Sequence, residues 1–101
     1  MAQTPEGRVK DQIKRFLKTL DCWFYMPVQN GMGVVGIPDI IGVIKGKFFA
    51  IECKAPGKEK NTTPNQDRVI GFIKAAGGIA FVASDVETVK QNLSLGGVYV
   101  P

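Results

Sequence analysis

The spacing of hydrophobic residues predicts that the chain begins with a helix. Between residues 5 and 20, apolar side chains recur every three or four positions, which places them on one face of a helix. Thr4 and Pro5 supply the N-cap residue and the first-turn proline that commonly begin such a helix. The residues expected to face the core are Val9, Ile13, Phe16, Leu17 and Leu20.

The rest of the pattern predicts several strands and two further helices. Thr63-Pro64 and the Ser84-x-x-Glu87 capping box indicate where the two helices begin. Strands are expected at 22–28, 40–44, 47–53 and 79–83, helices at 64–76 and 85–95, and an optional last strand at 98–100. The buried side of the second helix is expected to consist of Val69, Ile70, Phe72, Ile73 and Ala76. This order predicts an α/β sandwich, in which helices flank a mixed β-sheet.

Length and composition narrow the range of functions. The 101 residues are enough for one domain, 1–101, with a single core. The chain has no histidine, which excludes Ser/His and Cys/His nucleophilic catalysis and any ordinary zinc site. Thirteen Lys and Arg against nine Asp and Glu give a net charge of +4, which suits a polyanionic partner without requiring one. No segment resembles a signal peptide or a membrane span, so we expect an intracellular, cytoplasmic protein.

A polar cluster is expected at the open end of the second and third predicted strands. Lys45-Gly46 joins these strands and indicates a hairpin with a two-residue turn. In that register Asp39 lies directly opposite Glu52, with Cβ atoms roughly 5 Å apart. The two-residue period of a strand places Lys54 on the same face as Glu52. A three-residue loop would instead turn Asp39 to the opposite face.

Two carboxylates beside an ammonium group allow two interpretations. Neighbouring buried carboxylates repel each other and lose hydration, and Mg²⁺ would remove that conflict because hard cations take oxygen ligands. The lysine would then polarise a phosphate oxygen or help to activate water. In the other interpretation, an ordinary salt bridge of Asp39 or Glu52 with Lys54 caps the hairpin. The spacing alone favours neither.

Two further polar residues point toward the same region, and each has two interpretations. Glu6 lies near the apolar side of the first helix, where it is either a carboxylate favoured by the helix dipole or a third acid of the site. Gln66 points inward at the start of the second helix, where it either bonds to free backbone groups or partners a lysine, water or phosphate. The glycine-rich segment 29–36 is a candidate substrate contact. The aromatic residues 23–25 are expected to pack in the core and at the sheet edge rather than to stack on bases.

Taken together, these residues resemble the PD-(D/E)xK nuclease superfamily. The two-part core of that superfamily corresponds to Pro38-Asp39 followed by Glu52-Cys53-Lys54. The chain is most similar to the virus-type replication-repair nuclease (VRR-NUC) branch, and the resemblance covers nearly the whole chain. The features that carry it are Gly36-Ile37-Pro38-Asp39, the Glu-x-Lys-x-Pro run that ends at Pro56, Gln66 and Glu6. A restriction-endonuclease-like fold is the expectation that follows.

The resemblance implies Mg²⁺- or Mn²⁺-dependent hydrolysis of DNA phosphodiester bonds. It assigns metal binding to the side chains of Asp39 and Glu52 and to the backbone carbonyl of Cys53. It implies that Lys54 orients the water or stabilises the pentavalent phosphate. Gln66 would position Lys54 or the nucleophile, and Glu6 would complete the outer metal shell. The candidates for contact with DNA are Arg8, Asn30, Lys58 and Lys60.

The resemblance also bears on substrate and assembly. Stand-alone members of the family are similar to four-way-junction resolvases, and two active sites in a homodimer would suit such branched DNA. The strand at 22–28 and the terminus at 98–100 are the candidate dimer surfaces. Two alternatives stay open: a nuclease without junction preference that nicks duplex DNA or cleaves flaps, and a DNA-binding module without activity.

Overall fold

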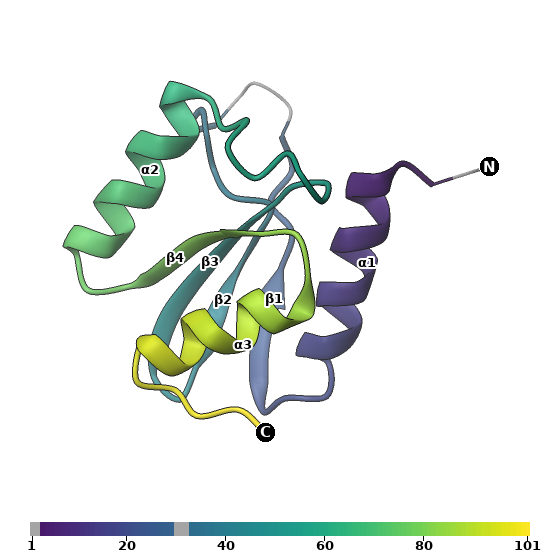
Figure 1. The fold of residues 1–101 in the computed structure, drawn as a ribbon. Coiled ribbons are helices and arrows are strands. Elements are labelled where there is room, and N and C mark those ends of the chain that lie inside the picture. The colour runs from purple at the N-terminus through teal and green to yellow at the C-terminus, as the bar shows by residue number, and fades with distance from the viewer. Residues whose placement is uncertain (1–2, 30–32) are drawn as a thin grey trace.

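The described part of the chain forms seven helices and strands in the order predicted from the sequence, α-β-β-β-α-β-α (Figure 1). The computed structural model describes residues 3–29 and 33–101. In chain order the elements are α1 (Pro5–Leu17), β1 (Cys22–Tyr25), β2 (Ile40–Ile44), β3 (Lys47–Cys53), α2 (Pro64–Ala75), β4 (Ile79–Ala83) and α3 (Val86–Leu95). The predicted α/β class is confirmed.

The four strands form one mixed sheet in the order β1-β2-β3-β4. The pairs β1–β2 and β2–β3 are antiparallel, whereas β3 and β4 are parallel. The turn between β2 and β3 consists of Lys45 and Gly46, with φ angles of 50° and 79°. Two successive residues with positive φ are what a type I′ hairpin turn requires. The turn sets Ile40 opposite Ile51, so the predicted register is confirmed.

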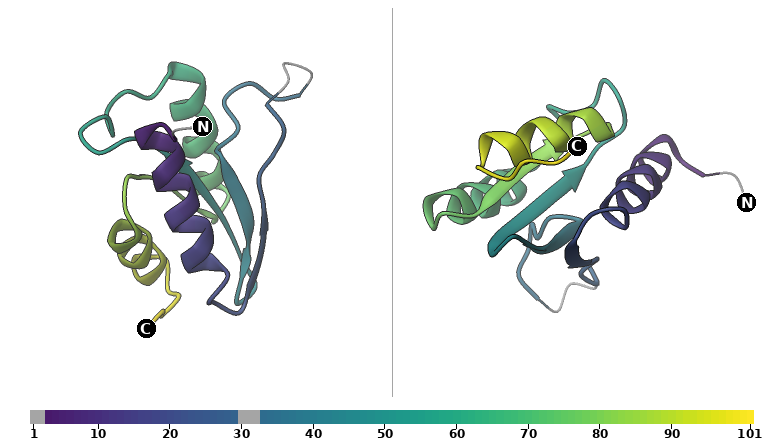
Figure 2. Two further views of the ribbon diagram at one scale, coloured as in Figure 1. Left: turned by 90° about the vertical axis from the view of Figure 1, so that its right-hand side faces the viewer. Right: turned by 90° about the horizontal axis from the view of Figure 1, so that it is seen from below.

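Helices cover both faces of the sheet, with α1 and α3 on one face and α2 on the other (Figures 1 and 2). The larger core lies under α1 and α3, where fully buried side chains such as Ile13, Phe49 and Leu93 meet. A smaller core that includes Ile70 and Ala80 lies under α2. Strand side chains serve the two cores alternately, because successive residues of a strand point to opposite faces.

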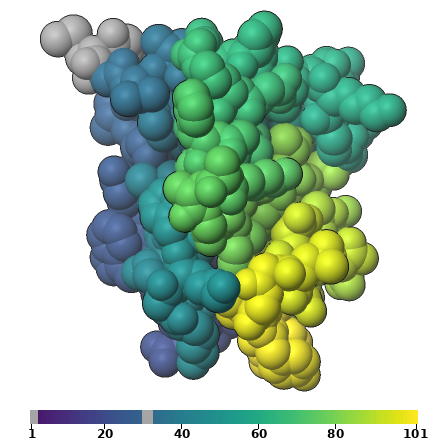
Figure 3. Space-filling view, turned by 90° about the vertical axis from the view of Figure 1, so that its left-hand side faces the viewer, coloured from purple at the N-terminus to yellow at the C-terminus, as the bar shows by residue number. Residues whose placement is uncertain are grey.

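Part of the sheet face that carries α2 stays open to solvent. We define this open sheet face by the exposed side chains Trp23, Tyr25, Val43 and Phe48. Phe24 packs partly buried against the larger core, as predicted. Trp23 and Tyr25 are 60% and 47% exposed, so for these two the prediction of core packing was wrong and the prediction of a place at the sheet edge is confirmed. They belong to the edge strand β1, whereas α2 lies across the β3–β4 side and leaves the strands beyond it visible (Figure 3).

The buried side of α2 is narrower than predicted. Ile70 and Ile73 pack on the sheet, whereas Phe72 and Ala76 are exposed. At about 100° per residue, a helix that turns Ile70 and Ile73 inward carries Phe72 to its outer side. In the described part of the chain, no helix has the length and apolar character needed to span a membrane.

Two boundaries differ from the prediction, each for a local reason. α3 is capped by Asp85 rather than Ser84, since the Asp85 carboxylate accepts a hydrogen bond of 2.7 Å from the Thr88 N–H. β1 ends at Tyr25 rather than at residue 28, because its partner strand begins at Ile40 and Tyr25 already pairs with Ile41.

The optional last strand at 98–100 does not form. Gly97 adopts a φ of 90°, and the Val98 N–H donates to the Leu93 carbonyl oxygen at 2.8 Å. This is the backbone arrangement of a glycine-terminated helix, and it turns the chain back on itself. Val98 is consequently buried against the core, and its N–H is used by the helix end rather than by a strand ladder.

Candidate active site

The predicted carboxylate pair forms at the open end of the β2–β3 hairpin. Asp39 immediately precedes β2, and one further step in the observed register sets it opposite Glu52. Asp39 Oδ2 accepts a hydrogen bond from the backbone N–H of Cys53 at 2.9 Å, which fixes one carboxylate oxygen. Glu52 is 3% exposed and is the only charged side chain that is buried in the described part of the chain. The hairpin therefore holds two acids at the end of the sheet.

The surroundings of Glu52 oppose its ionisation. Burial raises the pKa of Glu52, and repulsion from Asp39 adds to this effect, whereas Lys54 acts in the opposite direction. Together these influences raise the pKa to about 7. A buried carboxyl beside a second carboxylate becomes fully charged at neutral pH only with a compensating cation, and hard divalent cations suit such oxygen ligands.

Lys54 and Gln66 both approach Glu52 Oε2. Lys54 Nζ lies 3.6 Å away, on the face that the strand period predicts, and Gln66 Nε2 donates a hydrogen bond at 3.1 Å. Gln66 Oε1 also accepts from the Thr63 N–H at 2.9 Å, within a capping box at the start of α2. Gln66 therefore bonds to a free backbone group, as one interpretation predicted, and its second partner is the Glu52 carboxylate rather than the lysine, water or phosphate of the other interpretation. Because the cap uses its oxygen, its NH₂ group faces Glu52.

A glycine brings the loop before Asp39 against the start of α2. Gly36 has a φ of 87°, and a Cβ at this position would lie 2.5 Å from the carbonyl carbon of Asn65 and 2.9 Å from the Gln66 nitrogen. Glycine alone combines this left-handed backbone with such a close approach. Packing therefore explains the glycine of the Gly36-Ile37-Pro38-Asp39 run. Gly36 allows the Asp39 loop to lie against the helix that supplies Gln66.

The first helix adds a cation that the sequence analysis missed. Lys10 Nζ lies 3.5 Å from Asp39 Oδ1 and 3.4 Å from Glu6 Oε2. Burial lowers the pKa of Lys10, but attraction to Asp39 and Glu6 outweighs burial and leaves the pKa above its ordinary value. The available signal was the four-residue spacing of Glu6 and Lys10, which places both on one side of a helix. Glu6 thus reaches the site through Lys10.

The donor set fits a hard divalent cation. Within residues 3–29 and 33–101, no group of three or more acidic or thiol side chains is close enough to hold a metal ion. The pair Asp39 and Glu52 remains, and Mg²⁺ is commonly bound through one or two carboxylates together with water. The Cys53 thiol is buried in the core, and burial, with repulsion from both acids, raises its pKa to about 12. The backbone carbonyl is therefore the group of Cys53 that fits a hard metal.

Basic side chains lie at the same end of the molecule as the acids. Lys58 and Lys60 are exposed on the loop between β3 and α2, and Arg8 is exposed on α1. This loop and the first turns of α1 lie at the same end of the molecule in Figure 1 and in the left view of Figure 2. Asn30, the fourth predicted DNA contact, lies outside the described residues.

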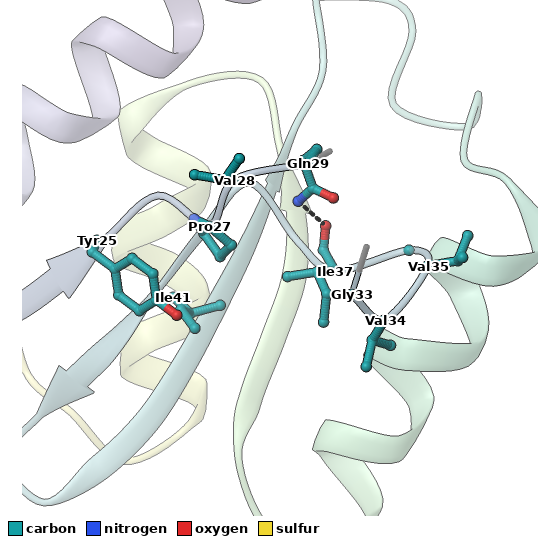
Figure 4. Close-up of a pocket in the computed structure, with 10 residues that line it drawn as sticks. Tyr25, Pro27, Val28, Gln29, Gly33, Val34, Val35, Ile37 and Ile41 are labelled. Atoms are coloured by element: carbon teal, nitrogen blue, oxygen red, sulfur yellow. Dashed lines mark hydrogen bonds between the residues drawn. The ribbon is translucent and has the colours of Figure 1, made fainter. Parts of the chain in front are cut away.

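A groove of about 450 Å³ is lined partly by the loop that precedes Asp39 (Figure 4). Tyr25 and Ile41 form one side, and the Gln29 side chain donates to the Ile37 carbonyl oxygen at 3.0 Å. None of the ten described residues that line it is charged. The groove therefore suits apolar or aromatic groups rather than phosphate, and it is separate from the carboxylate pair.

Comparison with known proteins does not assign this site to a family. The sequence matches no family model, and no curated protein is significantly similar to it. The case for the site accordingly comes from the motif residues and from the contacts among them.

Proposed function

We propose that this protein is a Mg²⁺- or Mn²⁺-dependent DNA endonuclease with a PD-(D/E)xK site of the VRR-NUC type. The observation that carries the proposal is the opposed pair Asp39 and Glu52 at the hairpin end, with Lys54 and Gln66 both directed at Glu52. An ordinary salt bridge explains this cluster less well. Lys10 and Lys54 are two ammonium groups among the three acids Glu6, Asp39 and Glu52, and the pKa of Glu52 stays at about 7 in spite of Lys54.

The metal would be held by the carboxylates of Asp39 and Glu52 and by the Cys53 carbonyl oxygen. When bound, it supplies Lewis-acid stabilisation of phosphate charge and lowers the pKa of water. Metal chemistry of this kind needs no histidine, which agrees with a chain that has none.

The residues around the pair orient the acids and stabilise charge. The Cys53 N–H fixes Asp39 Oδ2, and Gln66, itself held by the cap of α2, fixes Glu52 Oε2. Lys54 supplies an ammonium group for the charge that develops on the phosphate oxygens during attack by water. Lys58, Lys60 and Arg8 would contact the DNA backbone, where cations contribute affinity without sequence preference.

The substrate that we propose is branched DNA, with the four-way junction cut by a homodimer inside the cell. The open sheet face supports a dimer, because exposed apolar patches and unpaired edge strands commonly mark interfaces between proteins. Of the two candidate surfaces, this favours β1, because Trp23 and Tyr25 share an apolar face with Val43 and Phe48, whereas in the other Tyr99 is exposed but Val98 is buried. Two copies related by symmetry would present two active sites to the two equivalent strands of a junction.

Cleavage of a labelled four-way junction and of its matching linear duplex tests the proposal. Both substrates are incubated with Mg²⁺ or Mn²⁺, and EDTA serves as the control. Paired symmetric cuts in the junction alone, together with a dimeric mass by light scattering, are the expected result. Cuts in both substrates would remove the junction preference, and no cutting with either metal would favour a DNA-binding module without activity.

A further inference from the structure

Lys10 is a charged group that the proposed mechanism leaves without a role. The two oxygens of Asp39 have different partners: Oδ2 accepts from the Cys53 N–H, whereas Oδ1 faces Lys10 Nζ at 3.5 Å. The same ammonium lies 3.4 Å from Glu6 Oε2. Lys10 therefore bridges an acid of α1 and an acid of the hairpin, on the side of Asp39 that is turned away from the Cys53 N–H.

The charges around the site limit how many metal ions it accepts. Three carboxylates, those of Glu6, Asp39 and Glu52, contact two ammonium groups, those of Lys10 and Lys54. With all five groups ionised, the cluster carries one net negative charge, and one divalent ion already makes it net positive. A second divalent ion would enter a positive site only a few ångströms from the first, where Coulomb repulsion is strong.

We propose that Lys10 is the fixed second cation of this site. Its ammonium group lies between Glu6 and Asp39 and supplies there the positive charge that a second metal ion would otherwise bring. The site then takes a single divalent ion, through Asp39 and Glu52. This inference rests on the proposed metal-dependent function. Lys10 acts on the metal site rather than on the substrate, so it is a positioning residue.

Counting bound Mn²⁺ ions tests this role without any measure of activity. Free Mn²⁺ is followed by electron paramagnetic resonance, and affinity is measured by calorimetry, in the full-length protein. The wild type is expected to bind one ion. Lys10→Met keeps the length of the side chain and removes its charge, so it is expected to bind two ions, or one ion at least about tenfold more tightly. Lys10→Arg keeps the charge and is expected to bind one ion.

Lys14→Met is the matched control, because Lys14 lies one turn further along the same helix. It removes the same charge and is expected to leave the count and the affinity within about twofold of the wild type, since Lys14 is only half-buried and forms no ion pair with the described acids of the site. The fold of each variant is checked by circular dichroism. If Lys10→Met does not fold, Lys10→Gln, which also removes the charge, takes its place. The expectation is then the same: two bound ions, or one ion bound at least about tenfold more tightly.

The outcomes separate this inference from the proposed function. A wild type that binds two ions overturns the role of Lys10 and leaves the nuclease proposal standing. The role of Lys10 is also overturned if the wild type and Lys10→Met each bind one ion and the affinity of the variant is unchanged or weaker. Lys10 would then only join α1 to the hairpin. A wild type that binds no Mn²⁺ overturns both proposals.

Discussion

Replacing Glu52 with glutamine tests whether the ionised Glu52 carboxylate destabilises the metal-free fold. Glu52 is 3% exposed and lies beside Asp39, and its pKa is raised from 4.5 to about 7, first by burial and then by Asp39. The folded protein therefore binds a proton here more tightly than the unfolded chain does. By linkage, the free energy of unfolding falls as the pH rises from about 4.5 to about 7, and the loss is complete above this range.

The magnitude follows from the size of this pKa change. A rise from 4.5 to about 7 corresponds to about 3 kcal/mol, at about 1.4 kcal/mol for each pKa unit. Glutamine removes the charge and still accepts a hydrogen bond from Gln66, but it takes away the carboxylate that Lys54 contacts. We therefore expect Glu52→Gln to stabilise the metal-free protein by about 1–2 kcal/mol at pH 8. For a domain of this size, that raises Tm by roughly 5–10 °C.

The change in stability is measured by thermal unfolding in EDTA. Circular dichroism follows the unfolding at three pH values between about 4.5 and 8. The stability difference between Glu52→Gln and the wild type should be largest at the highest pH and should vanish at the lowest. Glu87→Gln, an exposed change in the first turn of α3, is the matched control and should not stabilise the protein at any pH. A Glu52→Gln protein that is less stable than the wild type at pH 8 would refute the reasoning.

Three further predictions follow from the contacts of the site. Gly36→Ala should lower the unfolding free energy by about 1–3 kcal/mol in urea titrations, because its Cβ would meet the backbone of α2. Gly33→Ala, whose Cβ would meet no atom of the described residues within 4 Å, is the control, and equal losses would contradict the packing argument. Gln66→Leu should cost about 2 kcal/mol, since it removes two hydrogen bonds; an unchanged urea midpoint would show that neither contributes. A thiol reagent should modify the half-buried Cys22 in the native protein, whereas modification of the fully buried Cys53 should follow global unfolding; equal rates would contradict this burial.

The hairpin and its acids were predictable because strand geometry relates residues by simple counting. The Lys45-Gly46 pair selects a two-residue turn, the turn fixes the register, and the register sets Asp39 opposite Glu52. The same period of two places Lys54 beside Glu52. The second hydrogen bond of Gln66 was also within reach, since the first turn of a helix offers both a capping role and an inward direction.

Other features depend on how elements pack, and local spacing does not encode packing. Lys10 meets Asp39 because α1 crosses the hairpin end, and the sequence shows only its spacing from Glu6. The exposure of Trp23 and Phe72 follows from where α2 lies on the sheet and how it is rotated. An apolar pattern alone does not reveal that a face stays uncovered.

Cleavage by the wild type and by Asp39→Asn tests the central claim most directly. Asparagine keeps the size of the side chain and an oxygen that can accept from the Cys53 N–H, but it loses the charge needed to bind a metal. In Mn²⁺, the wild type should cleave labelled branched DNA, and Asp39→Asn, purified in the same way, should be slower by at least about 10²–10³-fold. Equal rates for the two proteins, or no cleavage by the wild type, would contradict the assignment of a metal-dependent nuclease site to this hairpin.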